Sequence, residues 1–238
     1  MSVNEISMSQ KPIDNKNCDT PGRLLSVRLY VIISSRLCRK PVLETLRDVI
    51  SGGADAVQLR EKDMSDDEFY SLAVECRKIT ARSSTLFIVN DRAEIARDVA
   101  ADGLHVGQSD MPVSVARSVI GRNKILGVST HNVRQALAAQ QEGADYIGAG
   151  PLFPTATKAC EPPVGLAFLG QIQRDITIPF VAIGGITLEN LNETLSAGGG
   201  RVAVCSAIIS GDNVIQTTQL FRARLDALSP VGRIPKLS

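Results

Sequence analysis

Eight short, largely apolar runs that alternate with helical patterns predict an α/β fold, a single (β/α)8 TIM barrel with parallel strands. Runs of four to six apolar residues are typical of strands buried on both faces, as in a parallel sheet covered by helices. Polar residues directly follow most of these runs, at what would be the carboxyl ends of the strands. In a barrel these ends form one rim, where enzymes of this shape keep their active sites.

The predicted strands and helices follow one another in strict alternation. The strands are residues 28–33, 54–59, 86–89, 103–106, 125–128, 146–149, 180–183 and 201–204. The helices are residues 42–50, 66–81, 93–100, 113–120, 133–142, 164–172, 188–197 and 213–228. Ser65, Asn132 and Thr187 are the expected N-caps of three helices, because short polar side chains accept hydrogen bonds from the first free amide groups of a helix.

A weak internal repeat supports the repetition of one unit. Gly53-Ala54-Asp55, Ala101-Asp102-Gly103 and Gly143-Ala144-Asp145 each lie between a helix and the next strand, where small residues allow a tight turn. An open, doubly wound sheet is the alternative fold. Its first strand-to-helix turn would carry a G-x-G-x-x-G sequence, which is absent here.

Composition limits the class of protein and its partners. The chain has 238 residues, enough for a barrel of about 250 residues in a single domain. Its formal net charge of +1 argues against a nucleic-acid partner, and no apolar stretch approaches the roughly 20 residues of a membrane span. The five cysteines are scattered without a C-x-x-C pair, so we expect a reducing, cytoplasmic setting. The oligomeric state is not determined by these features.

Residues 27–228 are predicted to form the catalytic barrel, with an extension at each end. Residues 1–26 are polar, show no apolar periodicity and lack the apolar core of a secretion signal. We therefore expect them to be a disordered extension that contributes nothing to the core. Residues 229–238 are predicted to be a C-terminal tail.

A cluster of charges follows the second predicted strand. Arg60 and Lys62 flank Glu61, and strand alternation points the two cations in the same direction, with Gln58 behind them. Such a pair suits a polyanion such as pyrophosphate, since arginine offers a planar fork and lysine a point charge. A solvated run of charges, with Glu61 as internal partner, is the alternative.

Carboxylates follow the third and fourth predicted strands. Mg2+ commonly takes one or two carboxylates and completes its octahedron with water and substrate phosphate oxygens. Asp91 and Asp110 come from adjacent strand ends and are the candidate ligands. The alternative is that each residue caps the helix that follows it.

Phosphate-binding candidates follow the sixth, seventh and eighth strands. The long loop after residue 149 contains Thr155, Thr157 and Lys158, and loops of this kind in compact barrels are commonly functional. Gly184-Gly185 and Cys205-Ser206 match the position of the phosphate site that many barrels build from backbone amides. For Gly184-Gly185 taken alone, a simple tight turn is the favoured interpretation.

The two histidines do not form a catalytic triad with any serine or cysteine. His105 lies within a strand, and we interpret it as a structural core residue. His131 lies on the rim, where it is either a proton carrier or an exposed loop residue, and the sequence leaves this open.

Taken together, the segments resemble thiamine-phosphate synthases in an ordered series across roughly residues 28 to 225. The segments are Val57-Gln58-Leu59-Arg60-Glu61-Lys62, Val89-Asn90-Asp91-Arg92, Gly103-Leu104-His105-Val106-Gly107-Gln108-Ser109-Asp110, Gly127-Val128-Ser129-Thr130-His131, Gly143-Ala144-Asp145-Tyr146-Ile147-Gly148, Gly150-Pro151-Leu152-Phe153-Pro154-Thr155-Ala156-Thr157-Lys158 and Ala182-Ile183-Gly184-Gly185-Ile186. Each motif alone is weak, whereas the ordered set is specific.

The resemblance implies a magnesium-dependent enzyme that joins 4-amino-2-methyl-5-hydroxymethylpyrimidine diphosphate to 4-methyl-5-(2-phosphoethyl)thiazole. It implies that the diphosphate is held by Arg60, Lys62, Asn90 and Lys158 with Ser129 beside it, that Mg2+ is held by Asp91 and Asp110, that Gln58 lies against the pyrimidine, and that the thiazole phosphate is held by Thr155, Thr157, Gly185, Cys205 and Ser206. Of these, Arg60, Lys62, Ser129 and Lys158 are the expected catalytic residues. The implied chemistry is dissociative: pyrophosphate leaves first, and the thiazole nitrogen captures the resulting cation.

One departure and two alternative functions accompany this resemblance. The family usually has an acidic residue after its first strand, near the position of Ser34 in this chain. A related thiazole tautomerase is the first alternative, but that branch tends to lack the segment that here contains Gln108 and Asp110. A non-enzymatic barrel that binds phosphate ligands is the second alternative.

Overall fold

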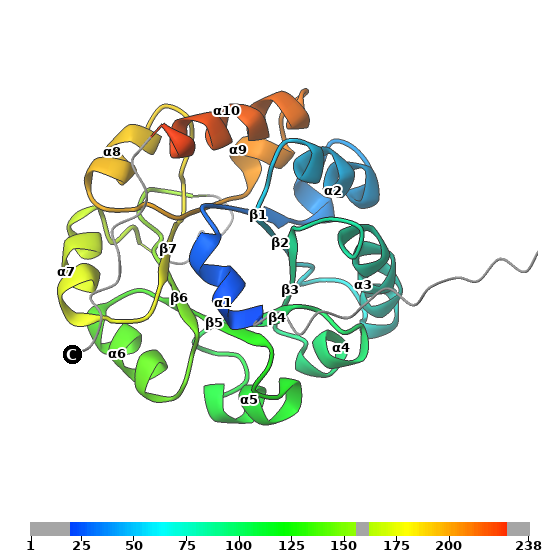
Figure 1. Cartoon of the computed structure of the whole chain (residues 1–238), viewed down its shortest axis with the longest axis horizontal. Helices are drawn as coiled ribbons and strands as arrows, with labels where there is room; N and C mark the ends of the chain where they lie inside the picture. The colour runs from blue at the N-terminus through cyan, green and yellow to red at the C-terminus, as the bar shows by residue number, and fades with distance from the viewer. Residues whose placement is uncertain (1–19, 156–161, 228–238) are drawn as a thin grey trace, which may run out of the picture.

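The computed structural model describes residues 20–155 and 162–227, which form a closed barrel of eight parallel strands. The strands follow one another in sequence order, and β8 pairs with β1 to close the sheet. Helices surround the barrel on the outside (Figure 1). The predicted (β/α)8 TIM barrel is therefore confirmed.

Every predicted strand is present, with small shifts at its ends. The strands are β1 (Leu29–Ile33), β2 (Ala56–Leu59), β3 (Leu86–Asn90), β4 (Gly103–Val106), β5 (Ile125–Thr130), β6 (Tyr146–Ala149), β7 (Phe180–Ile183) and β8 (Val202–Val204). The helices that correspond to the predicted ones are α2 (Val42–Ser51), α3 (Asp66–Thr80), α4 (Ala93–Asp98), α5 (Val113–Ile120), α6 (Val133–Gln141), α7 (Ala167–Asp175), α8 (Leu191–Ser196) and α10 (Val214–Asp226). Four short elements were not predicted: α1 (Thr20–Arg23), η1 (Leu24–Ser26), η2 (Ser35–Leu37) and α9 (Ser206–Ile209).

Strand alternation divides the buried residues into two cores. Side chains such as Leu29 and Val31 of β1 point outward and pack against the helices. Tyr30 and Ile32 of the same strand point inward, where they join residues of the same parity from the other strands. The inward set fills the barrel, so its interior is a packed core rather than a channel.

The aspartates of the internal repeat hold the ends of neighbouring strands together. Each of them accepts a hydrogen bond from a backbone amide at the start of the preceding strand and forms an ion pair with an arginine of a helix. The amide and arginine contacts are Asp55 with Leu29 (2.9 Å) and Arg222 (2.6 Å), Asp102 with Phe87 (2.8 Å) and Arg77 (3.0 Å), and Asp145 with Leu126 (2.7 Å) and Arg117 (2.6 Å). The repeat therefore marks a recurrent link at the amino-terminal end of the barrel.

Two of the three predicted N-caps are confirmed. Ser65 forms a capping box with Glu68, and the side chain of Asn132 accepts the amide of Gln135. The prediction for Thr187 was wrong, because α8 begins only at Leu191. The side chain of Asn190 instead folds the preceding loop back on itself, accepting the amide of Thr187 and donating to the carbonyl oxygen of Gly185, each at 2.8 Å.

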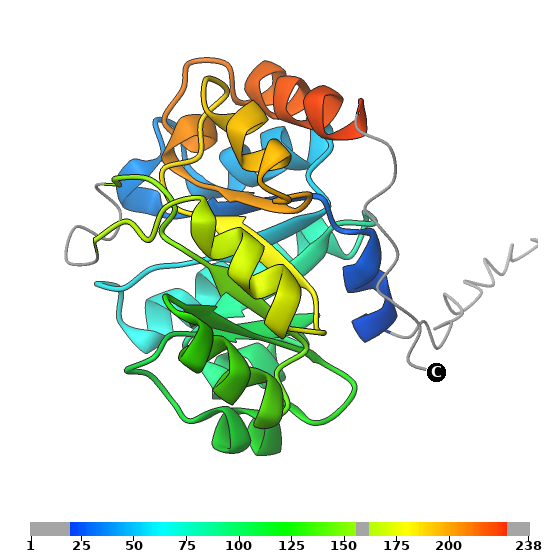
Figure 2. The same cartoon turned by 90° about the vertical axis from the view of Figure 1, so that its left-hand side faces the viewer.

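The segment before β1 corrects the prediction that residues 1–26 contribute nothing to the core. Residues 20–26 form α1 and η1, which lie across the amino-terminal end of the barrel (Figure 1). Figure 2 shows this segment at the opposite end of the barrel from the loop that follows β6. Leu24 is buried in the inner core, whose inward strand side chains would otherwise meet water at this end. Residues 1–19 and the predicted tail, residues 229–238, lie outside the described residues.

No helix within the described residues is long and apolar enough to cross a membrane.

Leu24 and Leu25 form a matched pair that tests this closure. Leu24 is 2% exposed and Leu25 is 51% exposed, although they are neighbours in η1. We predict that Leu24→Ala lowers the free energy of unfolding by about 2–4 kcal/mol, because it removes buried apolar contacts. Leu25→Ala should change it by less than about 0.5 kcal/mol. Urea denaturation of both variants measures the difference, and equal stabilities would contradict a structural role for this segment.

Candidate active site

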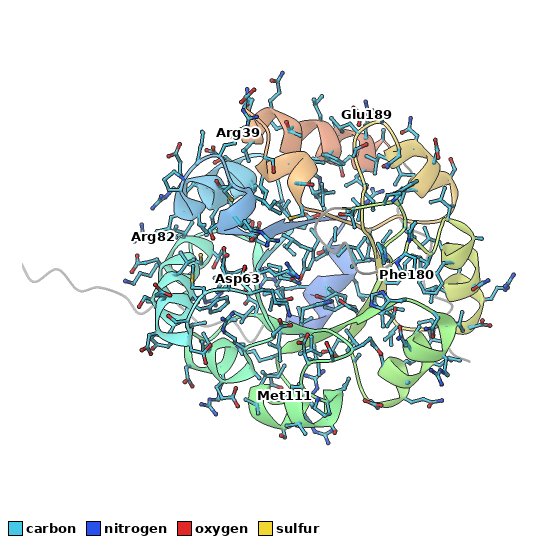
Figure 3. All side chains as sticks on the ribbon, turned by 180° about the vertical axis from the view of Figure 1, so that it is seen from behind. Arg39, Asp63, Arg82, Met111, Phe180 and Glu189 are labelled. Carbon is cyan, nitrogen blue, oxygen red and sulfur yellow. The ribbon has the colours of Figure 1, made fainter. Side chains whose placement is uncertain are left out.

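The predicted functional residues continue the inward parity of the strands beyond the sheet. Arg60 and Lys62 follow Gln58 at two-residue steps just beyond the end of β2. Asn90, Ser129 and Cys205 hold the corresponding positions after or within their own strands. Because parallel strands end at the same rim, these side chains converge at the carboxyl end of the barrel. Figure 3 views the barrel from the side opposite to Figure 1 and shows Asp63, of the loop after β2, beside the barrel opening.

A pocket at this rim brings together predicted residues from five different strand ends. Of the predicted residues, it is lined by Arg60, Ser129, Thr155, Gly185, Cys205 and Ser206. His131 and Gly184 also line it. The predicted residues Thr157 and Lys158 lie outside the described residues, and Asn90 is buried at the end of β3 without lining this pocket.

Lys62 connects the two candidate metal ligands. Its ammonium group donates a hydrogen bond to Asp91 and lies 3.6 Å from an Oδ1 of Asp110. Asp110 also accepts the amide of Gly107 at 2.8 Å. The alternative that these carboxylates are helix caps is wrong, because the N-cap positions of α4 and α5 belong to Arg92 and Pro112.

The carboxyl groups of Asp91 and Asp110 influence each other's protonation. The pKa of Asp91 is raised, first because burial disfavours the charged form, and further because Asp110 lies beside it. The pKa of Asp110 is lowered: burial alone would raise it, but its hydrogen bond with Asp91, the Gly107 amide and the Lys62 ammonium outweigh that effect. Asp91 also has a φ of 63°, a strained conformation for a residue with a side chain.

The donor set of this pair fits Mg2+ better than a transition metal. Within residues 20–155 and 162–227, no cluster of three or more histidine, cysteine, aspartate or glutamate side chains is arranged to hold a metal ion. Mg2+ needs only one or two carboxylates when water and substrate phosphate supply its other ligands. Asp91 and Asp110 meet this requirement, since one ammonium group already contacts both of them.

The backbone after β7 forms a sharp turn against the loop after β6. Gly184 and Gly185 have φ values of 97° and 66°, and a Cβ on Gly185 would lie 2.6 Å from the carbonyl oxygen of Pro154. The amide of Phe153 donates to the carbonyl oxygen of Gly184 at 3.0 Å. Glycine is thus required here for the turn and for the close approach of the two loops, and it leaves backbone atoms at the pocket wall.

A chain of hydrogen bonds inside the barrel leads to this pocket. Gln58 donates to Tyr30 (2.8 Å), Tyr30 contacts Tyr146 (3.0 Å), Tyr146 contacts Nδ1 of His105 (2.9 Å), and Nε2 of His105 contacts Ser129 (2.9 Å). His105 is buried and hydrogen-bonded, as expected of a core residue, but its partner Ser129 is a predicted site residue. Neither tyrosine was among the predicted site residues; their inward direction in β1 and β6 was the available signal.

Two further polar residues support the loops of the rim. A ring nitrogen of His131, Nδ1, forms a hydrogen bond with the carbonyl oxygen of Gly150, at the start of the loop after β6. Glu61 is buried and accepts hydrogen bonds from both the amide and the hydroxyl of Ser35. The chain thus carries a buried carboxylate, just beyond the end of β2, beside the position after β1 where the resemblance led us to expect an acidic residue.

Comparisons with known proteins agree with this geometry. A family model described as thiamine monophosphate synthase matches residues 29–208. A thiamine-phosphate synthase from Clostridium novyi is 43% identical over 80% of this chain and 94% of its own length. One from Chloroflexus aurantiacus is 45% identical over 85% of this chain and 94% of its own length. The solved structure of thiamine phosphate pyrophosphorylase from Pyrococcus furiosus superimposes with a TM-score of 0.79 and 38% identity, covering 86% of this chain and 98% of that one.

The closed parallel barrel, with cationic, carboxylate and glycine positions at its carboxyl rim, defines a barrel enzyme that acts on phosphorylated substrates. The chain belongs to the thiamine monophosphate synthase family. Enzymes of this family are transferases of thiamine biosynthesis.

Gly127 tests how the interior of the barrel makes room for its hydrogen-bonded side chains. A Cβ at Gly127 would lie 2.2 Å from the ring of Tyr146, whereas a Cβ at Gly170 of α7 would meet nothing within 4 Å. We predict that Gly127→Ala destabilises the fold by about 1–3 kcal/mol through overpacking. Gly170→Ala should be neutral or stabilise it by up to about 1 kcal/mol, because alanine favours helix. Thermal unfolding of the two variants measures this contrast, which would vanish if the ring of Tyr146 lay elsewhere.

Proposed function

We propose that this chain catalyses the thiamine-phosphate synthase reaction. In this reaction 4-amino-2-methyl-5-hydroxymethylpyrimidine diphosphate and 4-methyl-5-(2-phosphoethyl)thiazole give thiamine phosphate and pyrophosphate. The observation that carries the proposal is the contact of Lys62 with both Asp91 and Asp110, beside a pocket lined by Arg60 and Ser129. That arrangement combines cations for a diphosphate with carboxylates for the metal ion that accompanies it.

We assign the diphosphate to the side of the rim formed by β2, β3 and β5. Arg60, Lys62, Asn90 and Ser129 are the residues proposed to hold it, together with Lys158 of the loop after β6. Arginine and lysine neutralise phosphate charge, and the amide and hydroxyl groups donate further hydrogen bonds. Gln58 is proposed to contact the pyrimidine ring, because it lies one inward step deeper in β2 than Arg60.

Mg2+ is proposed to bind between Asp91 and Asp110. When bound, the ion would neutralise charge on the diphosphate and make pyrophosphate a better leaving group. The ammonium group of Lys62 contacts both of these carboxylates, which supports the proposal that a cation is accommodated between them.

We assign the thiazole phosphate to the opposite wall of the pocket. Thr155, Gly185, Cys205 and Ser206 line this wall, and Thr157 is proposed to join them. Burial raises the pKa of the Cys205 thiol to about 12, so this side chain stays neutral beside an anion and does not act as a nucleophile.

The residues favour a dissociative reaction. Departure of pyrophosphate breaks the C–O bond and leaves a pyrimidinylmethyl cation, and the lone pair of the thiazole nitrogen then forms the new C–N bond. No proton has to be removed from the nitrogen, so a general base is not required. The chain instead contributes positioning and neutralisation of the charge that builds on the leaving group.

We further propose that the partners of this protein are its small-molecule substrates, not nucleic acid or a membrane, and that it acts in the cytoplasm. The low net charge offers no broad basic surface for nucleic acid. The described cysteines, Cys38, Cys76 and Cys205, are all free, which suits a reducing compartment.

The metal proposal predicts that activity depends on Mg2+ through Asp110. Excess EDTA should abolish pyrophosphate release, and Asp110→Ala should raise sharply the Mg2+ concentration required for half-maximal rate. Asp98→Ala, which removes an exposed carboxylate of α4, should behave like the wild type. Full activity in EDTA would contradict the proposal.

The leaving-group proposal predicts a specific kinetic effect at Lys158. A cation that stabilises departing pyrophosphate acts more strongly in the transition state than in the ground state. Lys158→Ala should therefore lower kcat at least about tenfold, roughly 1.4 kcal/mol of barrier, with a smaller change in KM for the pyrimidine diphosphate. Lys78→Ala, at an exposed position of α3, is the control. A normal kcat in Lys158→Ala would remove this residue from the catalytic set.

A further inference from the structure

Five side chains form a continuous path across the interior of the barrel, which we call the inner relay. In order, the path runs Gln58, Tyr30, Tyr146, His105 and Ser129, with each neighbouring pair 2.8–3.0 Å apart. All five are buried, and they come from β2, β1, β6, β4 and β5. The two ends of the inner relay are the residues proposed above to contact the pyrimidine and the diphosphate of one substrate.

The middle of the inner relay consists of groups that both donate and accept. Burial raises the pKa of Tyr30 and of Tyr146 above the ordinary value for tyrosine, so both phenols keep their protons. A phenol with one proton can donate only one hydrogen bond along the path and must accept at its other side. A neutral imidazole follows the same rule, because one ring nitrogen carries the proton and the other accepts.

All the hydrogen bonds along this path can be formed in only two ways, which differ in the direction of donation. In the forward direction Gln58 donates to Tyr30, each hydroxyl donates to the next group, and His105 carries its proton on Nε2 and donates to Ser129. The hydroxyl of Ser129 is then left to donate outward, and Oε1 of Gln58 is left to accept. In the reverse direction Ser129 donates inward to His105, and Gln58 accepts from Tyr30 and presents its NH2 group outward.

The structure has Gln58 as donor to Tyr30, which is the forward direction. This direction matches a ligand that offers a hydrogen-bond donor to Gln58 and an anionic oxygen to Ser129. An amino-substituted pyrimidine with a diphosphate has both groups. A pyrimidine with a carbonyl in place of the amino group would favour the reverse direction, which turns the hydroxyl of Ser129 away from the diphosphate.

We propose that the inner relay is a specificity device that couples recognition of the amino group at Gln58 to binding of the diphosphate at Ser129. Tyr30, Tyr146 and His105 are positioning residues in this device, since they act on the substrate through Gln58 and Ser129. The inference rests on the proposed function, because that function places one substrate across both ends.

Binding of two separate ligand fragments tests the coupling directly. Calorimetry would measure the affinity for magnesium pyrophosphate with and without saturating 4-amino-5-hydroxymethyl-2-methylpyrimidine. The wild type should bind magnesium pyrophosphate at least about fivefold more tightly when the pyrimidine is present than when it is absent, a typical coupling between sites. Tyr30→Phe and Tyr146→Phe should each reduce this factor to about one, because each interrupts the path while keeping the ring.

The third tyrosine of the chain supplies the matched control. Tyr70 lies on α3, is 43% exposed and has no part in the inner relay. Tyr70→Phe should retain the coupling of the wild type. The thermal midpoints of all three variants show whether they are folded. Because Tyr30→Phe and Tyr146→Phe interrupt the path at two different positions, a local packing effect of one substitution would not explain the loss of coupling in both.

Nitrogen-15 NMR of labelled histidine gives a second readout that simple packing would not change. The chain has two histidines, so His131→Asn assigns the signals of His105. With both fragments bound, His105 should be protonated on Nε2 and unprotonated on Nδ1. With the 4-oxo analogue of the pyrimidine, the proton should move to Nδ1. Pyrophosphate is left out of this second sample, because its anionic oxygens would themselves favour the forward direction.

The outcomes separate failure of the inference from failure of the proposed function. If the wild type binds neither fragment, the proposed function is wrong. If it binds both without coupling, or if Tyr146→Phe keeps the coupling, or if His105 does not change tautomer with the analogue, the inner relay is only a structural network and the inference is overturned.

Discussion

The closure of eight parallel strands into one barrel is the constraint on which the site depends. In the closed sheet, every second side chain of each strand points into a shared interior. Residues that continue this alternation beyond the strand ends face the barrel opening at the carboxyl rim. Tyr30 and Gln58 are therefore interior residues for the same reason that Arg60 and Lys62 face the opening. A shift of one residue in the register of β2 would move both cations to the helix side and bring Leu59 and Glu61 inward.

The two ends of the barrel carry different kinds of contacts. At the amino-terminal end, α1 and η1 cover the inner core, and Asp55, Asp102 and Asp145 join strand amides to arginines of the helices. At the carboxyl end, charges are left facing a pocket, and Asp91 sits in a strained backbone conformation beside Lys62. Stabilising contacts thus collect at one end, and groups able to bind anions and a cation collect at the other.

Polar groups inside the barrel carry a cost unless each has a partner. In this chain the buried polar side chains of the inner relay form one connected path from Gln58 to Ser129. The same hydrogen bonds that offset the cost of burying these groups therefore extend to the pocket at the rim. Gly127 supports this arrangement by leaving space for the ring of Tyr146. The interior tyrosines are therefore connected, through His105, to Ser129 at the wall of the pocket.

The sequence by itself determined the eight strands, their order and the rim positions. These follow from local patterns, since a short apolar run reflects burial on both faces and a polar residue two steps beyond an inward one keeps its direction. The parity of Arg60 and Lys62 could be predicted in this way. The predicted cap at Thr187 was wrong because the side chain of Asn190 contacts the backbone of Thr187 and Gly185, which local capping rules do not consider.

Only the tertiary structure decided which distant residues meet. Tyr30 and Tyr146 are 116 positions apart, and Lys62 and Asp91 are 29 apart; no local pattern encodes either contact. Leu24 lies in a polar segment without periodicity, and its burial depends on a barrel end that exists only after closure. The physical reason is the same in each case: local periodicity specifies the direction of a side chain, whereas its partner is set by how the sheet closes around the shared interior.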